Sequence, residues 1–218
     1  MIGVFPYLAR YPSAHLLFVQ LLAILVYPFV ESLEHGRAIV GVFGIMVLVA
    51  AIRLVRSSPN TQWIALILAA FVLVLTIAAE FVSSDTLTAT LPILSAAFYF
   101  YAAFSLIRYM LEDLRATTDE LFAVGATFTL LAWAFAHTYA ACQVITPHSF
   151  TAGINPESAR TWVELLYLSF AVLSGVGLSD ISPLQPFARS VVMLEQFAGV
   201  MYIALVVTRL VALSARQR

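Results

Sequence analysis

The residues best suited to chemistry lie in one short stretch, YLSFAVLSGVGLSDISP, which runs from Tyr167 to Pro183. Gly175 and Gly177 lie close together in it, and Asp180 follows them. Glycine adopts backbone angles that other residues avoid, which allows main-chain carbonyl groups to approach a ligand closely. The pattern therefore indicates a site made of backbone oxygens, with one carboxylate beside it.

The rest of the chain has the composition of a polytopic membrane protein. Of its 218 residues, 62% are hydrophobic and 11% are charged, against roughly 45–50% and about 25% in soluble domains. A membrane-spanning helix needs about 20 apolar residues. The sequence predicts an all-α fold with six such helices, at residues 13–30, 37–55, 62–83, 88–110, 119–145 and 187–213.

The segment TWVELLYLSFAVL, between the fifth and sixth predicted spans, is too short to cross a bilayer. About 13 helical residues reach roughly 20 Å, so we expect a re-entrant helix that follows an exposed polar turret, PHSFTAGINPESAR. Glu164 near its start suits the positive helix N-terminus. Irregular backbone at membrane depth occurs only beside protein or water. Residues 175–180 should therefore line a pore or a cavity.

Arginine placement predicts the orientation. All 11 basic residues are arginine and the net charge is -1, which excludes the basic surface typical of nucleic-acid binding. If both termini are cytoplasmic, eight arginines lie inside and three outside, as the positive-inside rule favours. The inside ones are Arg10, Arg53, Arg56, Arg108, Arg115, Arg209, Arg216 and Arg218, and the outside ones are Arg37, Arg160 and Arg189. The tail after the last span is too short for a soluble regulatory domain, so we expect none in this chain.

A family resemblance rests on the stretch VLSGVGLSD, from Val172 to Asp180. It resembles the pore loop T-x-T-T-V-G-Y-G-D of the potassium channel superfamily, with Val176, Gly177 and Asp180 identical and Ser174 in place of threonine. LLYLSFAVL resembles the pore helix, ISPLQPFARS the outer mouth and VMLEQFAGVMYIALVVTRLVAL the inner helix. The resemblance covers roughly residues 119–213 and is closest to small six-span bacterial members.

The resemblance implies a cation channel rather than an enzyme. Its selectivity filter would be formed by Ser174, Gly175, Val176, Gly177, Leu178, Ser179 and Asp180. The permeant ion, potassium or another monovalent cation, would lie at Gly175, Val176, Gly177 and Leu178, with no cofactor and no other metal. One loop cannot make a ring, so the fourfold pore requires a homotetramer. The resemblance also implies contact with membrane lipids and a place in the bacterial inner membrane.

The resemblance further assigns supporting roles around the filter. Asp180 would brace the filter or hold cations at its outer mouth, with Tyr167 in place of the usual tryptophan partner. Apart from the resemblance, Glu195 lies within the first two turns of the sixth predicted span and is expected to face the pore helix or Arg189 across the subunit. Gly199 matches the hinge glycine of the inner helix, and a close helix contact at a small residue explains it equally well.

Three positions depart from the family pattern. Gly175 replaces a threonine that would offer both a hydroxyl and a carbonyl, and Leu178 replaces a tyrosine. Ser179 replaces a glycine and, if it kept the left-handed conformation, would cost on the order of 1 kcal/mol per subunit. We therefore expect weaker discrimination among cations, with a channel-like protein whose filter does not conduct as the alternative.

The sequence predicts two domains, a four-helix peripheral domain at residues 1–115 and a pore domain at 116–218. The first occupies the position of a voltage sensor. A sensor needs several arginines on its fourth helix, because each charge moved through 100 mV contributes about 2.3 kcal/mol. The fourth span carries only Arg108, so steep voltage gating is not expected.

Two other classes compete with the channel. A secondary transporter would show broken helices at corresponding positions in both halves, and only the second half has a re-entrant loop here. An intramembrane hydrolase could pair His137 with Ser174 or Ser179 as base and nucleophile. The sequence VLSG lacks the first glycine of a G-x-S-G elbow, and a histidine that packs between helices is the simpler interpretation.

Overall fold

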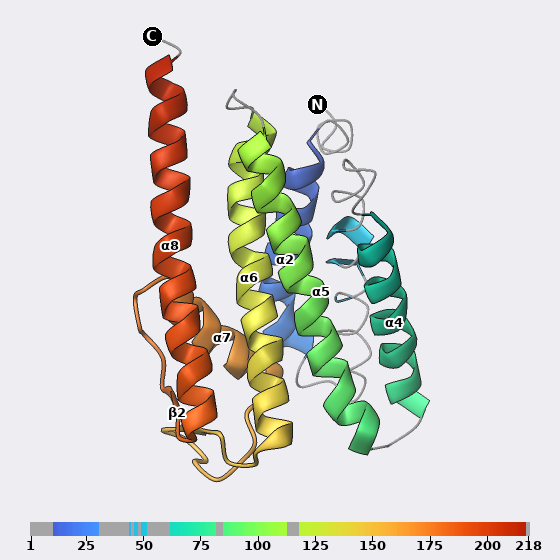
Figure 1. Cartoon of the computed structure of the whole chain (residues 1–218). Helices are drawn as coiled ribbons and strands as arrows, with labels where there is room; N and C mark the ends of the chain where they lie inside the picture. Colours follow the sequence, from blue (N-terminus) through green and yellow to red (C-terminus); the bar gives the residue numbers. More distant parts are fainter. Residues whose placement is uncertain are drawn as a thin grey trace. The chain divides into compact units, whose positions relative to one another are not determined.

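The computed structural model describes residues 11–30, 44, 46–47, 49–51, 62–81, 85–112 and 118–216. This part of the chain is mostly helical, and Figure 1 shows its elements. They are α2 (Pro12–Val30), α4 (Gln62–Phe81), α5 (Asp85–Glu112), α6 (Thr118–Ile145), β1 (Phe150–Ala152), α7 (Trp162–Leu173), β2 (Ile181–Pro183) and α8 (Pro186–Arg216). Most of the second predicted span, at 37–55, and the predicted domain boundary after residue 115 lie outside the described residues.

Three of the described helices are long and apolar enough to cross a membrane, at Thr86–Leu111, Thr118–Ile145 and Pro186–Arg209. They correspond to the fourth, fifth and sixth predicted spans. Pro12–Tyr27 and Trp63–Ala79 are shorter apolar helices. The predicted all-α membrane class is thus confirmed, while the number of six spans stays a prediction.

The chain forms two compact units, and α5 and α6 each contribute to both. In the first unit, which includes the described residues up to 81 and residues 100–130 where described, α2 packs on the first half of α6. The Ser13 hydroxyl donates to Asp119 Oδ2 at 2.8 Å, and the Gln20 side chain donates to the Ala126 carbonyl at 3.4 Å. Ser13 and Gln20 are fully buried, so these bonds satisfy the Ser13 hydroxyl and the Gln20 amide N–H between two apolar helices, while Oε1 of Gln20 has no partner among the described residues.

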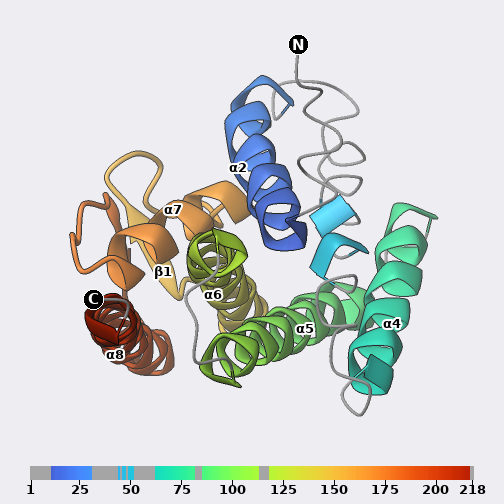
Figure 2. The same ribbon diagram turned by 90° about the horizontal axis from the view of Figure 1, so that it is seen from above.

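The second unit contains the predicted pore elements, with residues 85–99 of α5, 131–145 of α6, and β1, α7, β2 and α8. Figures 1 and 2 show that the short helix α7 lies beside the second half of α6 and beside α8. The buried face of α7 consists of Leu165, Leu166, Leu168, Ser169, Ala171, Val172 and Leu173. This twelve-residue helix matches the predicted re-entrant helix in position and length.

The predicted turret contains a strand that the sequence analysis missed. β1 pairs antiparallel with β2, with Phe150 opposite Pro183 and Ala152 opposite Ile181. Phe150 is 2% exposed, so the pairing also buries an aromatic side chain. A three-residue strand is too short for an alternating pattern to stand out in a sequence. The pairing fastens the segment before α7 to the segment after it.

α8 turns one narrow stripe toward its own unit. Up to residue 209, its fully or largely buried side chains are Ala188, Val191, Val192, Glu195, Tyr202 and Val206, and the buried Gly199 lies on the same stripe. Large apolar side chains are exposed elsewhere on this part of α8, including Met193, Leu194, Phe197, Val200 and Met201. In a membrane protein such a surface suits lipid chains or neighbouring copies.

Candidate functional site

A capping box starts α7. The Thr161 hydroxyl accepts a hydrogen bond from the Glu164 backbone N–H at 3.3 Å, and the Glu164 carboxylate accepts from the Thr161 N–H at 2.6 Å. The first backbone donors of a helix lack partners within it, and this reciprocal pair satisfies two of them. The predicted capping role of Glu164 is confirmed, and it defines where the short helix begins.

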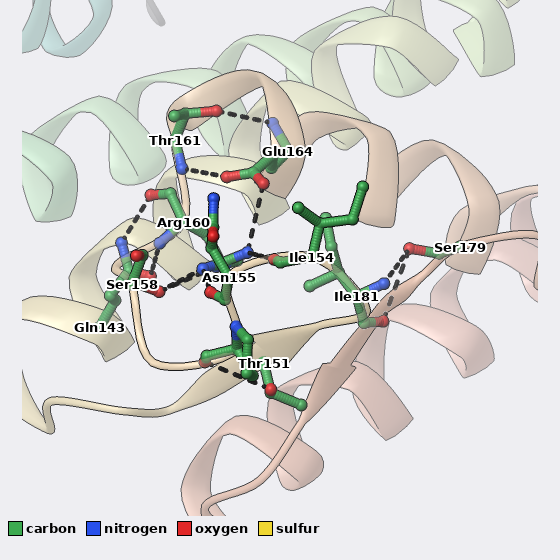
Figure 3. A network of polar contacts seen from close by, with 11 residues as sticks. Gln143, Thr151, Ile154, Asn155, Ser158, Arg160, Thr161, Glu164, Ser179 and Ile181 are labelled. Carbon is green, nitrogen blue, oxygen red and sulfur yellow. Dashed lines mark hydrogen bonds and ion pairs between the residues drawn. The ribbon is translucent and has the colours of Figure 1, made fainter.

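Arg160 organises the loop before α7, as Figure 3 shows. Although arginine is usually exposed, Arg160 is only 5% exposed. Its guanidinium donates to the Asn155 carbonyl at 2.6 Å and to the Ser158 carbonyl, and it pairs with Glu164 at 3.3 Å. The rigid fork of donors on arginine suits several acceptors held around it. One side chain therefore holds the loop against the start of α7.

The same loop is fastened to the end of α6. The Gln143 side-chain carbonyl accepts from the Arg160 N–H at 2.7 Å, and its amide donates to the Arg160 carbonyl at 2.9 Å. Gln143 and Arg160 are thus joined by two hydrogen bonds of opposite direction. Together with the capping box, this contact positions the start of α7 relative to α6.

Residues 174–180 turn back against the end of α7. Gly175 has φ 73° and Gly177 has φ 68°, both in the left-handed region that favours glycine. The Gly175 N–H donates to the Val172 carbonyl at 3.0 Å, and the Gly177 N–H donates to the Ala171 carbonyl at 2.8 Å. The two glycines therefore allow the chain to close the end of the helix with its own backbone.

Much of the same segment is exposed, including two large apolar side chains. Val176 and Leu178 are 71% and 70% exposed. Within the described part of the chain, the carbonyl oxygens of Gly175, Val176 and Leu178 accept no hydrogen bond, whereas the Gly177 carbonyl accepts from the Ser179 N–H at 3.0 Å. Chemically, the segment presents a short run of free carbonyl oxygens, the donor type that binds alkali-metal cations.

Ser179 does not have the left-handed conformation considered for it. Among described residues other than glycine, positive φ occurs at His148 and Asn155. The Ser179 hydroxyl instead accepts from the Ile181 N–H at 3.1 Å, which links the exposed segment to the first residue of β2 (Figure 3). The expected strain at this serine is therefore absent from this conformation.

The side chains expected to brace the outer end of the segment do not meet within one chain. Asp180 is exposed and Tyr167 is 46% exposed, and in the described residues no hydrogen bond joins them. Arg189 donates from Nε to the Pro183 carbonyl at 3.2 Å rather than to Glu195. Tyr167, Asp180 and Arg189 thus lie on the surface, where a neighbouring copy could reach them.

Glu195 lies on the buried stripe of α8 and is 0% exposed. Its carboxyl group is hydrogen-bonded to the hydroxyl of Tyr139 on α6 and to the hydroxyl of Ser169 on α7. The position facing the pore helix, one of the two expected for Glu195, is the one observed. The sequence analysis missed Tyr139 and Ser169, although a serine inside the apolar run of α7 is a signal of a buried polar contact.

Gly199 lies one turn beyond Glu195 on the same face of α8. A Cβ atom added to Gly199 would lie 2.1 Å from the Leu173 carbonyl oxygen and 2.8 Å from its carbonyl carbon. The absence of a side chain therefore allows the backbones of α8 and α7 to touch. This geometry supports the close-contact interpretation of Gly199, and the hinge stays a prediction.

The structure does not bring the histidine and serines of the hydrolase hypothesis together. The His137 ring stacks on Tyr99 at 5.3 Å and contacts Trp162, the first residue of α7, at 5.7 Å. Ser174 follows the other end of α7, about 18 Å along a twelve-residue helix. In the described residues, no group of three or more His, Cys, Asp or Glu side chains could hold a metal ion.

Part of the chain matches a known protein family. Residues 97–215, more than half of the chain, match the model of a protein family described as ion channel. The matched residues include the second half of α5 and all of α6 and α7. No curated protein and no solved structure matches the chain.

Proposed function

This chain belongs to the ion channel family, and from that premise we propose that four copies form a pore that conducts potassium or other monovalent cations. The ion path runs along residues 174–180, where the carbonyl oxygens of Gly175, Val176 and Leu178 supply the ligands. The carbonyl of Gly177 joins them once it releases the Ser179 N–H. The chain is an integral membrane protein, and we place it in a bacterial inner membrane with both termini cytoplasmic.

One observation carries this proposal most directly: free carbonyl oxygens and large apolar side chains share the same exposed segment. Val176 and Leu178 expose most of their surface in a single chain. Exposed apolar side chains that flank polar groups mark an interaction surface. Four such segments around an axis would cover the apolar side chains and leave the carbonyl oxygens facing a narrow ion path.

Residues outside the segment complete the proposed pore. Asp180 and Tyr167 support its outer end through contacts between copies, and Arg189 holds the strand that follows it. The free surface of α8 faces lipids and neighbouring copies. Conduction needs no cofactor, and the surrounding helices in residues 1–115 add no steep voltage dependence.

A second candidate is a channel-like protein whose filter does not conduct. The hydrogen bond between the Ser179 N–H and the Gly177 carbonyl favours it, because that oxygen is then turned away from a passing ion. A filter held in this conformation would lack one of its four rings of ligands. The two candidates differ in flux and not in fold.

Ion flux into liposomes tests the proposal. Purified protein, shown to be tetrameric, is reconstituted, and uptake of potassium and of sodium is compared with uptake by empty vesicles. We expect potassium uptake well above that of empty vesicles, with sodium uptake slower but measurable. Verified tetramers that carry neither ion would contradict the conducting channel and favour the non-conducting candidate.

A further inference from the structure

A buried acid in a membrane helix demands explanation, and Glu195 is fully buried in α8. A carboxylate removed from water is costly unless it is paired or hydrogen-bonded. Within the described residues, no arginine or histidine comes within ion-pair distance of Glu195. Its neighbours are two hydroxyl groups, from Tyr139 and Ser169, which are also fully buried.

The number of hydrogens in this cluster limits how its bonds can be made. Ser169 Oγ lies within hydrogen-bond distance of two acceptors, the Ala132 carbonyl at 2.8 Å and the Glu195 carboxyl. A serine hydroxyl has one hydrogen, and a carbonyl only accepts. Both contacts are satisfied together when the carboxyl group of Glu195 supplies the second hydrogen. A neutral glutamic acid therefore fits the cluster better than a carboxylate.

The cluster also sets the register of α7 against α8. Ser169 and Leu173 lie one turn apart on α7, and Glu195 and Gly199 lie one turn apart on α8. Ser169 contacts Glu195, and the Leu173 backbone contacts Gly199. The polar contact thus holds two helices at the turn before their backbones touch. Leu173 is the last residue of α7, directly before the exposed segment.

We propose that Glu195, as a neutral acid bonded to Tyr139 and Ser169, is a positioning residue that fixes the pore helix α7 and, through it, residues 174–180. The cluster joins the outer helix, the pore helix and the inner helix of one subunit. Within one chain, this cluster supports residues 174–180 through α7, whereas Tyr167 and Asp180 do not support them. This inference rests on the proposed channel function for its effect on selectivity.

Two substitutions test whether the Glu195 side chain acts as a neutral hydrogen-bonding group, as a charge, or only through its volume. Glu195→Gln keeps the size, one acceptor and a donor group, so it should retain wild-type selectivity between potassium and sodium, measured from reversal potentials. Glu195→Leu keeps the volume but removes the hydrogen bonds, so it should lower the permeability ratio several-fold while tetramers still form. If Glu195→Gln lowered the permeability ratio as much as Glu195→Leu does, the proposal that Glu195 is a neutral acid would be overturned.

Amide hydrogen exchange tests the positioning role without relying on conduction. The Gly175 and Gly177 N–H groups, bonded to the end of α7, are the reporters. Loss of a buried hydrogen bond should speed their exchange about tenfold in Glu195→Leu and in the milder Ser169→Ala and Tyr139→Phe. Unchanged exchange in all three variants would overturn the positioning role. This readout decides the inference even if the wild-type protein carries no ions.

Thr138→Val is the matched control. Thr138 lies beside Tyr139 on α6, but its hydroxyl donates to the Ala134 carbonyl of the same helix at 2.9 Å. Removing it takes one hydroxyl from the same region and breaks a hydrogen bond that lies within α6. Exchange at Gly175 and Gly177 and the permeability ratio should both stay at wild-type values. Acceleration equal to that of Tyr139→Phe would attribute the effect to α6 alone and overturn the proposed cluster.

Discussion

At the scale of single residues, two glycines define the exposed segment through their backbone angles. Gly175 and Gly177 have positive φ, and a Cβ atom added to either would meet no atom within 4 Å. Within one chain, space is therefore available at both positions, and backbone conformation is the obstacle to a side chain. This separates them from Gly199, where the obstacle is the backbone of Leu173.

Gly177→Ala should disturb the segment through conformation alone. An L-residue in the left-handed region costs about 1–2 kcal/mol, repeated in every subunit, so we expect potassium flux into liposomes to fall strongly while tetramers persist. Gly153→Ala is the control, because Gly153 is equally open but has no positive φ. Equal flux in the two variants would show that the left-handed angle is not needed.

The residue scale is also where sequence reasoning was least complete. The motif comparison predicts that Gly175 lacks the hydroxyl ligand of a threonine. The structure adds that Gly175 has a left-handed φ, in which a β-branched residue such as threonine would be strained. The sequence predicts that Glu195 lies on the sixth span. It does not reveal the partners of Glu195, because Tyr139 and Ser169 lie on two other helices. Only folding brings three such distant residues together.

At the scale of elements, α7 is held at both ends. Arg160, Gln143 and the capping box hold its start, and the contact of Leu173 with Gly199 holds its end. The sequence predicted this helix well because its apolar run is short and bounded by Thr161 and Gly175. The β1–β2 pair was missed because each strand is too short to show a period.

Arg160→Ala should destabilise the loop before α7. The substitution leaves the Ser158 carbonyl without its donors, removes one of two donors to the Asn155 carbonyl and takes the ion-pair partner from Glu164, at a cost of about 2 kcal/mol or more. Thermal unfolding of the detergent-solubilised protein measures the effect. Arg189→Ala is the control, because that guanidinium is exposed and its described contact is one bond to the Pro183 carbonyl. Equal shifts in melting temperature would contradict the role of Arg160.

Gly199→Ala tests the contact between α7 and α8. A methyl group there would meet backbone atoms of Leu173, which cannot move aside cheaply, so we expect about 1–3 kcal/mol of destabilisation. Gly125→Ala is the control. A Cβ atom added to Gly125 would lie 2.9 Å from Cδ2 of Leu17, which belongs to a flexible side chain. A gain in helix propensity of about 1 kcal/mol offsets this contact, so we expect little change in stability. If both variants melt like the wild type, the close contact does not limit position 199.

At the scale of the whole molecule, the family match covers the elements that are predicted to form a pore. It begins inside α5 and runs through α8, so the membrane class and the channel family are the parts of the sequence-based account that are confirmed. The number of spans and the role of residues 1–115 stay predictions. Pore symmetry lies beyond one chain, because a ring of carbonyl oxygens needs several copies.

Particle symmetry distinguishes a channel from a carrier. A single pore loop per chain predicts a fourfold particle with residues 174–180 of every copy at the axis. Electron microscopy of the purified protein in lipid nanodiscs measures this symmetry. A monomer or a twofold dimer would contradict the channel assembly and favour a secondary transporter.

The reversal potential of the purified tetramer in a planar bilayer measures both conduction and ion selectivity. With potassium on one side and an equal concentration of sodium on the other, we expect a cation current whose reversal potential is negative on the potassium side. The departures at Gly175, Leu178 and Ser179 should keep this potential smaller than that of a strictly potassium-selective pore. A current carried by anions, or no current from verified tetramers, would rule out the proposed cation channel.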